Sequence, residues 1–467
     1  MDRLTKGSIS QLEMFIEEIR KSYDAKGVAV SIVDGAGNTR YENFFGCRDE
    51  EKKKEINADT MFGIASCTKS FTCLAILQLQ ERGLLDIHDL VSDYIPEFTG
   101  KNQPGLRIWH LMCHSGGFFP LERIVVDKVA ADLGISDESE GDLAYSEKLA
   151  VEGVKRVAGR LDAQTREKGL IGAPGEYYSY CNDGFALLSD IIRRVSGMSF
   201  ADYLKENILL PLGMDRSGCD FVRPAVDENA SVLYEMRDGV MCGDHDFHND
   251  AFVLNGGGAM KSTINDLKKY LLMYLHEGRG MNGTRIIGET LVHEMCRPKI
   301  SYRAGSSYAS GLSVKTLGGM TVYEHGGSLP GVSSNIAFSY DADAAVIVLC
   351  NTMDVPVSLI ADAAMKAYMG VSPLIERPIY REEVWSRELQ EDAAGTYVSA
   401  EGTTLVLAAG EDGRPAAFVD GKERKIVCTG PKTAAVIGRY SDGFIRLYQR
   451  EGKVFAAHFG SRIFPKG

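Results

Sequence analysis

The sequence predicts an α/β protein of the α+β type, in which helices flank an antiparallel sheet and a small all-β domain follows. Two observations predict this fold. Helical patterns and strand-like runs share the first part of the chain, with strand-like runs near its beginning and again between residues 320 and 351. From about Gly395 onward, short β-prone runs alternate with Asp-Gly or Glu-Gly turns, which is typical of a small barrel or sandwich.

The first predicted element is a helix that begins at a capping box formed by Ser10 and Glu13. Its apolar residues recur at helical spacing on one face: Leu12, Phe15, Ile16, Ile19 and Tyr23. The runs "GVAVSIVD" and "TRYENFFG" flank the turn-forming stretch "GAGN", so we expect a β-hairpin next.

A second helix follows Ser66 and ends near Gly83, a residue type suited to the position after a helix. The stretch "DGFALLSDIIRRVSG" predicts another amphipathic helix, which Gly197 ends. Three strand-like runs, "MTVYE", "SSNIAFSY" and "AAVIVLCN", precede a helix over "VSLIADAAMKAYMG". We therefore predict a large domain over residues 1–375, a linker over 376–393 and a small β-barrel domain over 394–467.

Charge and apolar patterning narrow the classes of partner. The formal net charge of the 467 residues is −12, so a nucleic-acid backbone or an anionic membrane surface is repelled on average. No apolar core of signal-peptide length is present near the first residue, and no segment approaches the ~20 apolar residues that cross a bilayer. Ten cysteines without a CxxC pair indicate reduced thiols. We expect a cytoplasmic protein.

The segment "GIASCTKSFTCLAI" contains the first candidate catalytic pair, Ser66 and Lys69. Residues three apart on a helix lie on one face, about 5–6 Å from each other. Desolvation among apolar neighbours and the positive end of the helix dipole both lower the pKa of an amine placed there. A partly neutral lysine accepts the serine proton, and the backbone N–H of Ser66 forms half of an oxyanion hole. A solvated surface lysine is the alternative, because this short motif is common.

Two further motifs supply polar groups. The stretch "PGEYYSYCNDG" places Tyr180 and Asn182 on a loop that opens a helix. A tyrosine beside an ammonium ionises more easily and relays protons, and an asparagine holds both the lysine and a substrate carbonyl. A packed aromatic residue and a helix cap are the alternative.

The third motif is "HGGS", directly after the strand-like run "MTVYE", and it begins at His325. Gly326 and Gly327 allow a substrate to approach a strand edge closely, and the backbone N–H of Ser328 completes the oxyanion hole. A turn after a strand is the alternative interpretation.

In this order, the three motifs resemble the serine–lysine pattern of penicillin-binding proteins and serine β-lactamases. The chain is identified as a member of the class C β-lactamase-like serine hydrolases, which include esterases, D-aminopeptidases and D,D-peptidases. The resemblance runs from about Gly27 to Gly370 and includes "NADTMFGIASCTKSFT", "LRIWHLMCHSGGF" and "EHGGSLPGVSSNIAFSYDADAAVIVLCN". It implies a β-lactamase/transpeptidase-like fold with an all-helical subdomain beside the sheet.

The resemblance also implies roles for the site residues. Ser66 is then the acylated nucleophile, Lys69 and Tyr180 are the proton-transfer pair, Asn182 is a second-motif contact and His325 belongs to the third motif. True β-lactamases often carry a lysine there, which is a fixed cation for a substrate carboxylate. This chain has a histidine there, and the charge of a histidine depends on its surroundings. An antibiotic-degrading enzyme is therefore the less favoured interpretation.

We expect a serine hydrolase that cleaves an amide or ester bond through an acyl-enzyme on Ser66. Its substrate is a small molecule or short peptide, with D-amino-acid peptides favoured and small esters close behind. An acyltransferase, a β-lactamase and a non-catalytic binding protein remain alternatives. No cofactor is expected, because "NGGGAMKS" lacks the spacing of a phosphate-binding loop. No metal is expected either, since glycine and aspartates around Cys242, His245 and His248 favour a loop.

Two regions are expected to shape the site or the assembly. Residues 121–170 are charged and helical in pattern, and we expect them to wall the pocket and determine substrate choice. His114, in "CHSGG", is expected to order a loop. The C-terminal domain resembles the lipocalin-like domains of some family members, including peptidases that form closed oligomers. A homo-oligomer formed through this domain is one expectation, and a packing appendage is the alternative.

Overall fold

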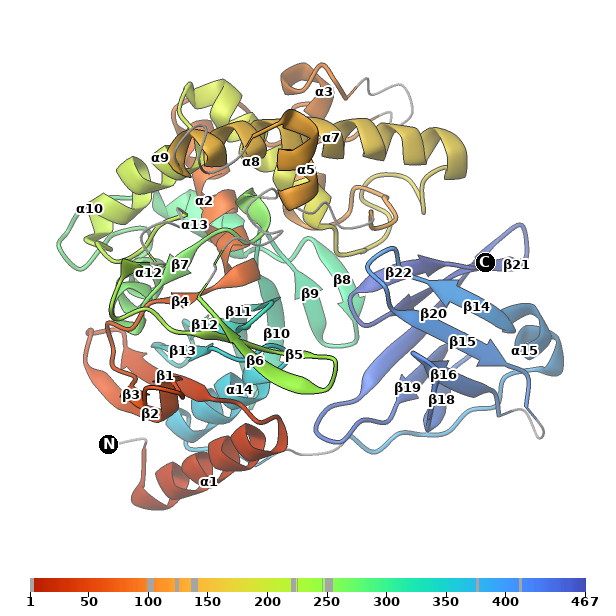
Figure 1. Cartoon of the computed structure of the whole chain (residues 1–467). Helices are drawn as coiled ribbons and strands as arrows, with labels where there is room; N and C mark the ends of the chain where they lie inside the picture. The colour runs from red at the N-terminus through yellow and green to blue at the C-terminus, as the bar shows by residue number, and fades with distance from the viewer. Residues whose placement is uncertain are drawn as a thin grey trace.

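The computed structural model describes the chain from residue 4 to its end, with nine short gaps. The described residues are 4–98, 105–121, 126–135, 142–219, 224, 226–245, 247, 255–374, 378–410 and 414–467. A central sheet, a group of helices above it and a β domain beside it make up the molecule (Figure 1).

A nine-stranded antiparallel sheet forms the centre of the large domain, in the order β3-β2-β1-β13-β12-β11-β10-β9-β8. Its strands are β1 (Gly27–Asp34), β2 (Thr39–Asp49), β3 (Lys54–Glu55), β8 (Ile300–Arg303), β9 (Ser306–Tyr308), β10 (Ser313–Leu317), β11 (Met320–Leu329), β12 (Val332–Ser339) and β13 (Ala344–Cys350). The predicted N-terminal hairpin and the three late strands are confirmed. Strand β1 pairs with β13, which joins the two ends of the domain in one sheet.

The sheet is covered on both faces. Helices α1 (Lys6–Ser22) and α14 (Val357–Tyr368) pack on one face together with Val346 and Val348 of β13. Ile347 and Leu349 of the same strand face the opposite core, which contains helices α2 (Thr68–Glu81), α8 (Asn182–Ser196) and α12 (Ile264–Leu275). Strand residues buried on both faces explain why β1, β12 and β13 are fully buried along their length.

The first helix begins earlier than predicted. Thr5 is its N-cap and forms a capping box with Ser8, so the predicted pair Ser10 and Glu13 does not cap it. Glu13 instead accepts hydrogen bonds from Tyr41 and Asn43 on the sheet, at 3.3 and 2.9 Å. The Glu13 carboxylate therefore binds the sheet and does not cap the helix, although the sequence pattern predicted the cap.

The helical subdomain implied by the resemblance lies above the sheet (Figure 1). Gly197 has a φ of +72° directly after α8, as predicted for a helix-ending glycine. Further helices in the described part of the large domain are α3 (Val91–Tyr94), α4 (Ile108–Met112), α5 (Val126–Leu133), α7 (Asp142–Lys168), α9 (Phe200–Leu204), α10 (Leu210–Leu212) and α13 (Glu289–Cys296). Its short strands include β4 (Phe62–Gly63), β7 (Lys261–Ser262), β5 (Leu233–Arg237) and β6 (Val240–Asp244).

In its described residues, the C-terminal domain is all-β apart from one helix, α15 (Arg387–Ala393). One sheet contains β14 (Gly395–Val398), β15 (Thr404–Ala408), β16 (Ala416–Val419) and β17 (Lys422–Arg424). The other contains β18 (Ile426–Gly430), β19 (Thr433–Val436), β20 (Gly443–Arg450), β21 (Lys453–Phe459) and β22 (Arg462–Pro465). The strands are thus divided between two sheets, and an isolated bridge joins Tyr397 of β14 to Lys466, the residue after β22.

Turn chemistry explains the strand reversals in this domain. Residues in both Asp420-Gly421 and Glu451-Gly452 have positive φ, the conformation of a tight hairpin turn. The predicted turn at 412–413 lies outside the described residues. Trp385 and α15, which fall in the predicted linker, pack in the core of this domain, where the Trp385 indole donates to the Gly430 carbonyl at 3.0 Å.

The C-terminal domain docks on the large domain through a small apolar cluster. Phe119 and Ile171 pack there against Ala456 and Ile463 of β21 and β22. Arg450 donates hydrogen bonds to the carbonyls of residues 170 and 171 at 2.9 and 3.1 Å. This contact places β22 beside the loop that precedes α8.

The ten cysteines all lie in the described part of the chain and are free thiols. Eight of them are buried, as the apolar runs around them indicate. Among the described helices, none combines the length and the apolar character needed to cross a membrane.

Candidate active site

Ser66 lies in a single 3₁₀ turn, η1 (Ala65–Cys67), directly before α2. Between Met61 and Leu79, a fully described stretch, it is the only residue that is not buried. Ala65, before it, has a φ of +44°, a conformation that costs a non-glycine residue about 1–2 kcal/mol. The Thr68 hydroxyl donates to the Ala65 carbonyl at 2.7 Å and thereby supports this turn. The surrounding core therefore presents one hydroxyl to solvent on a rigid support.

Cys67 is not a competing nucleophile. Its side chain is fully buried, and its thiol lies 3.1 Å from the His325 carbonyl and 3.3 Å from the Ser334 hydroxyl. Burial raises the pKa of the Cys67 thiol to about 12. The thiol therefore stays protonated and packs against the sheet, as its position next to Ser66 on the helix predicted.

Lys69 is fully buried and donates three hydrogen bonds. Its ammonium lies 3.0 Å from Ser66 Oγ, 2.9 Å from Asn182 Oδ1 and 2.6 Å from the Gly257 carbonyl. None of the three acceptors is a carboxylate, so the positive charge has no direct counter-charge. The interpretation of Lys69 as a solvated surface lysine is therefore wrong.

This environment lowers the pKa of Lys69 to about 7. Burial is the largest cause, and the positive charge of Arg462 adds to it, whereas Glu401 acts in the opposite direction. Both protonation states are populated near neutral pH. A neutral Lys69 has a lone pair to accept a proton from the Ser66 hydroxyl, which is its nearest proton donor among these partners.

Tyr180 lies in the loop before α8, and its ring contacts two cationic or aromatic neighbours. The His114 ring centroid is 4.0 Å away, and the Arg462 guanidinium carbon is 4.7 Å from the Tyr180 ring centroid. Burial raises the pKa of Tyr180, while a hydrogen bond with Ser66 acts in the opposite direction. The expectation that a nearby ammonium makes this phenol ionise more easily is thus wrong, because desolvation outweighs the charge. A protonated Tyr180 is a proton donor beside Ser66.

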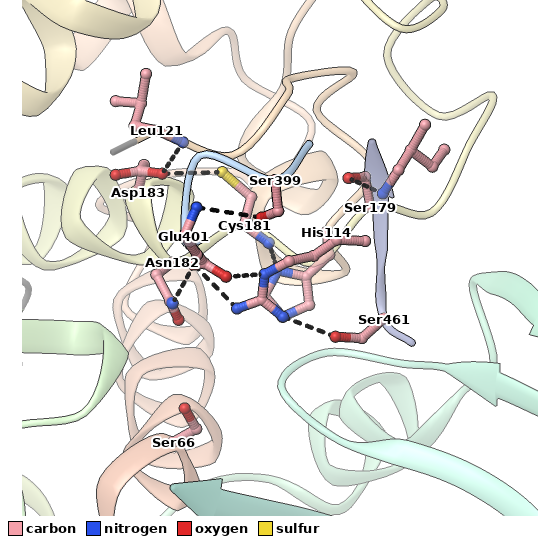
Figure 2. A network of polar contacts seen from close by, with 12 residues as sticks. Ser66, His114, Leu121, Ser179, Cys181, Asn182, Asp183, Ser399, Glu401 and Ser461 are labelled. Carbon is pink, nitrogen blue, oxygen red and sulfur yellow. Dashed lines mark hydrogen bonds and ion pairs between the residues drawn. The ribbon is translucent and has the colours of Figure 1, made fainter. Parts of the chain in front are cut away.

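Asn182 is the first residue of α8. Its Oδ1 accepts from Lys69, and its Nδ2 donates to Glu401 Oε1 at 3.3 Å. Figure 2 shows Asn182 between Ser66, in the turn before α2, and Glu401 on the C-terminal domain. The predicted contact between Asn182 and the lysine is present, and the contact to a substrate carbonyl stays a prediction.

His325 is buried on β11 and faces away from solvent. Its Nε2 lies 2.7 Å from the Tyr308 hydroxyl, and its Nδ1 lies 2.6 Å from the Gly326 carbonyl. Burial, with a smaller effect of Lys69, lowers the pKa of His325 to about 3. The imidazole is therefore neutral at physiological pH and supplies no fixed cation for a substrate carboxylate.

The glycines after His325 have different roles. A Cβ on Gly327 would lie 2.4 Å from the Ile64 carbonyl oxygen, so glycine is required where β11 packs on η1. A Cβ on Gly326 would meet nothing closer than 3.7 Å, and this residue is exposed. Ser328 is exposed at the end of the same strand. The structure thus brings β11 beside the Ser66 turn, with Gly326 and Ser328 open to solvent.

Four contributors to the site escaped the sequence reasoning. His114 was expected only to order a loop, which it does by accepting the Cys181 N–H at 3.1 Å, but it also contacts Tyr180. The Gly257 carbonyl belongs to η3 (Asn255–Gly257), part of the glycine-rich stretch that we excluded as a cofactor loop. Glu401 and Arg462 come from the C-terminal domain, and no local pattern marks either residue.

The cysteine–histidine group considered for a metal does not come together among the described residues. Cys242 lies on β6, where its thiol contacts the Val240 carbonyl at 3.7 Å, and His245 is exposed. His248 lies outside the described residues. Residues 242–244 of this segment belong to β6, which pairs with β5, and do not form the expected loop.

The fold and the Ser66–Lys69–Tyr180–Asn182 cluster define a serine–lysine site on a mixed α/β scaffold. Residues 12–368 match the Beta-lactamase family, which is most of the chain. The protein therefore belongs to the Beta-lactamase family.

Three relatives illustrate the range of similarity. Penicillin-binding protein 4* of Bacillus subtilis (strain 168) is 30% identical over 208 residues, which are 44% of this chain and 40% of that protein. D-aminopeptidase of Brucella anthropi is 24% identical over 410 residues, which are 85% of this chain and 70% of that enzyme. An octameric penicillin-binding protein homologue from Pyrococcus abyssi is 25% identical, with a TM-score of 0.68, and the match covers 98% of this chain and 100% of that chain. The chain thus spans less than half the length of the first of these relatives.

Proposed function

We propose that the protein is a serine hydrolase that cleaves an amide or ester bond through an acyl-enzyme on Ser66. The observation that carries the proposal is the contact of a buried Lys69, without a carboxylate partner, to the Ser66 hydroxyl at 3.0 Å. A lysine whose pKa is about 7 matches the requirement that a general base titrate near the working pH.

In the proposed mechanism, neutral Lys69 accepts the Ser66 proton while Oγ attacks the substrate carbonyl carbon. The backbone N–H groups of Ser66 and Ser328 stabilise the oxyanion that forms. Tyr180 donates its proton to the departing nitrogen or oxygen and is reprotonated from Lys69. In the second half, a water molecule loses a proton to the same pair and attacks the ester, which releases the acid and restores Ser66.

Among amides and esters, we propose short peptides, and D-amino-acid peptides in particular, as the substrate class. The match to D-aminopeptidase extends over 85% of this chain and supports this choice. A neutral His325 supports it over β-lactam hydrolysis, because the third motif then lacks the fixed cation that β-lactamases often use there. Small esters are the second candidate class, since an acyl-enzyme accepts either leaving group.

The first experiment is intact-protein mass spectrometry after incubation with a fluorophosphonate. We expect one adduct on Ser66 and none in Ser66→Ala. A folded wild-type protein without any adduct would support the non-catalytic binding alternative. A panel of D- and L-aminoacyl p-nitroanilides and p-nitrophenyl esters then identifies the substrate class, and added amines or alcohols reveal an acyltransferase through new acyl products.

Compartment and assembly are also proposals. Ten free thiols support a cytoplasmic location. The octameric homologue from Pyrococcus abyssi supports self-association of this chain, and we propose the C-terminal domain as the contact surface. Light scattering of the purified full chain checks the second point, and a monomer mass at micromolar concentration would contradict it.

A further inference from the structure

Two turns of the C-terminal domain contact the loop that holds Tyr180 and Asn182. The turn between β21 and β22 contributes the Ser461 carbonyl, which accepts the Tyr180 N–H at 2.9 Å. The backbone N–H of Ile463 donates to the Ser179 hydroxyl at 3.2 Å. The turn between β14 and β15 carries Glu401, which Figure 2 shows beside Asn182. The loop that holds Tyr180 and Asn182 is thus bound by the C-terminal domain on both sides of the tyrosine.

Protein groups already bind the Arg462 guanidinium. Its Nη2 donates to Glu401 Oε1 at 3.0 Å, its Nε contacts the other carboxylate oxygen, and its Nη1 donates to the Ser461 hydroxyl at 2.7 Å. The Arg462 side chain is only 19% exposed. A guanidinium whose fork already holds a carboxylate is a poor free site for an anionic substrate. The guanidinium carbon lies 4.7 Å from the Tyr180 ring centroid, which indicates that Arg462 acts on the proposed catalytic residues and not directly on a substrate.

Glu401 fixes the orientation of the Asn182 amide. A carboxylate only accepts hydrogen bonds, and an ammonium only donates them. The amide satisfies both neighbours in one orientation, with Nδ2 toward Glu401 and Oδ1 toward Lys69, at 3.3 and 2.9 Å. A continuous polar chain therefore connects Arg462 and Glu401 with Asn182, Lys69 and Ser66.

We propose that Arg462 and Glu401 are positioning residues of the acyl-enzyme site. Arg462 holds the Tyr180 ring and places a permanent positive charge near the Lys69 amine, and Glu401 orients Asn182 toward that amine. The inference rests on the proposed function, because it concerns how the C-terminal domain completes that site. It gives this domain a part in catalysis, in place of a mere packing appendage.

The two residues affect Lys69 with opposite signs. The positive Arg462 lowers the pKa of Lys69, and the negative Glu401 raises it. The other titratable groups that interact with Lys69 or lie beside it are Cys67 of η1, Cys73 of α2, His114, Tyr180, Cys181 and His325 of β11. Burial keeps the thiols and the phenol protonated and the two histidines neutral near pH 7, so Arg462 and Glu401 are the charged members of this set.

The test is the pH profile of kcat/KM for p-nitrophenyl acetate hydrolysis by the full chain, whose acidic limb reports the Lys69 pKa of the free enzyme. Arg462→Gln should move the limb to higher pH by about 1 unit, and Glu401→Gln should move it to lower pH by a similar amount. Arg462→Lys keeps the charge and should leave the limb within about 0.3 unit of wild type while lowering kcat. Arg424→Gln removes a charge from the exposed edge strand β17 and should move nothing.

Shifts of the acidic limb in opposite directions would support the inference. A loss of packing alone does not depend on the charge of the residue that is removed, so it predicts no such difference. Shifts in the same direction, or an unmoved limb in variants whose Ser66 still takes a fluorophosphonate, would overturn it. If Arg462→Gln does not fold, as a thermal melt would show, Glu401→Gln and Arg462→Lys decide the question alone. Absence of an adduct in the wild-type protein would instead refute the proposed function, so the two failures are distinguishable.

Discussion

Replacing Lys69 with methionine should lower activity by orders of magnitude and stabilise the protein. Folding lowers the pKa of Lys69 from 10.5 to about 7. Each pKa unit corresponds to about 1.4 kcal/mol, so the buried ammonium destabilises the fold by about 5 kcal/mol relative to a neutral amine. The substitution leaves two acceptors, Asn182 Oδ1 and the Gly257 carbonyl, without a donor. Each of them costs about 1–3 kcal/mol, which offsets part of the stability gained by removing the ammonium. Lys69→Met should therefore be at least as stable as wild type at acidic pH.

The sign of the pH dependence follows from proton binding. Between pH 7 and 10.5 the unfolded chain binds a proton at Lys69 that the folded chain releases, so wild-type stability rises with pH in this window. Below pH 7 both states are protonated and the full destabilisation remains. The melting temperature of Lys69→Met should thus exceed that of wild type most at pH 6, and the difference should shrink toward pH 10.

Differential scanning calorimetry at pH 6 and pH 9, together with kcat/KM on an ester substrate, checks both parts. We expect a loss of about 10²–10⁴ in kcat/KM, the range for a general base. Lys315→Met is the matched control, because the Lys315 side chain is only 10% exposed and its ammonium lies 2.7 and 2.6 Å from Glu324 and Asp362. Removing that ammonium leaves two carboxylates unpaired and should destabilise by about 3–5 kcal/mol. A Lys69→Met variant that keeps its activity, or that is less stable than wild type at pH 6, would refute the reasoning.

Three further predictions concern single contacts. Tyr180→Phe should lower kcat on p-nitroanilides more than on p-nitrophenyl esters, since a nitroanilide needs a proton donor; equal losses in steady-state kinetics would exclude that role. Gly327→Ala should destabilise by about 1–3 kcal/mol in urea unfolding, because its Cβ meets the Ile64 carbonyl oxygen at 2.4 Å, whereas Gly326→Ala should be neutral; equal effects would contradict this. Trp385→Ala should destabilise the C-terminal domain by about 3–5 kcal/mol in thermal melts; an unchanged melt would place Trp385 outside its core.

Local patterns predicted much of the fold. The N-terminal hairpin, the helix after Ser66, the end of α8 at Gly197 and the late strands all follow from spacing and turn residues within about 15 positions of each other. The pairing of β1 with β13 does not follow from local patterns, because the two strands are more than 300 residues apart. An apolar run predicts a buried strand but does not identify the strand that pairs with it. The cap of α1 was missed for a related reason, since Glu13 is used by Tyr41 and Asn43.

The sequence did contain a signal for the β5–β6 hairpin, although we expected a loop at residues 242–248. Asp238 and Gly239 have positive φ between β5 and β6, and an Asp-Gly pair flanked by apolar residues is a strong hairpin indicator. The nearby cysteine and histidines drew attention to a metal instead. The expected role of residues 121–170 in substrate choice stays a prediction, although α5 and α7 confirm their helical pattern.

The candidate site also contains residues that local sequence predicts and residues that depend on the tertiary structure. Ser66 and Lys69 were predictable because one helical turn sets their distance. Asn182 and Tyr180 were recognisable through the order of the motifs. Arg462 and Glu401 were not, because their place depends on how the C-terminal domain docks, and a lone arginine near the end of a β domain has no distinguishing pattern. The pKa directions of Tyr180 and His325 likewise depend on burial, which only the folded structure defines.

The rate at which a fluorophosphonate phosphonylates Ser66, with loss of fluoride, tests the activation of Ser66 by Lys69 without any assumption about the natural substrate. It is measured by intact mass between pH 5 and pH 9. A sigmoidal rise with a midpoint near pH 7, lost in Lys69→Met, is the outcome that a deprotonated amine behind the hydroxyl requires. A rate that stays flat across this range, or that survives the methionine substitution, would mean that some other group activates the serine.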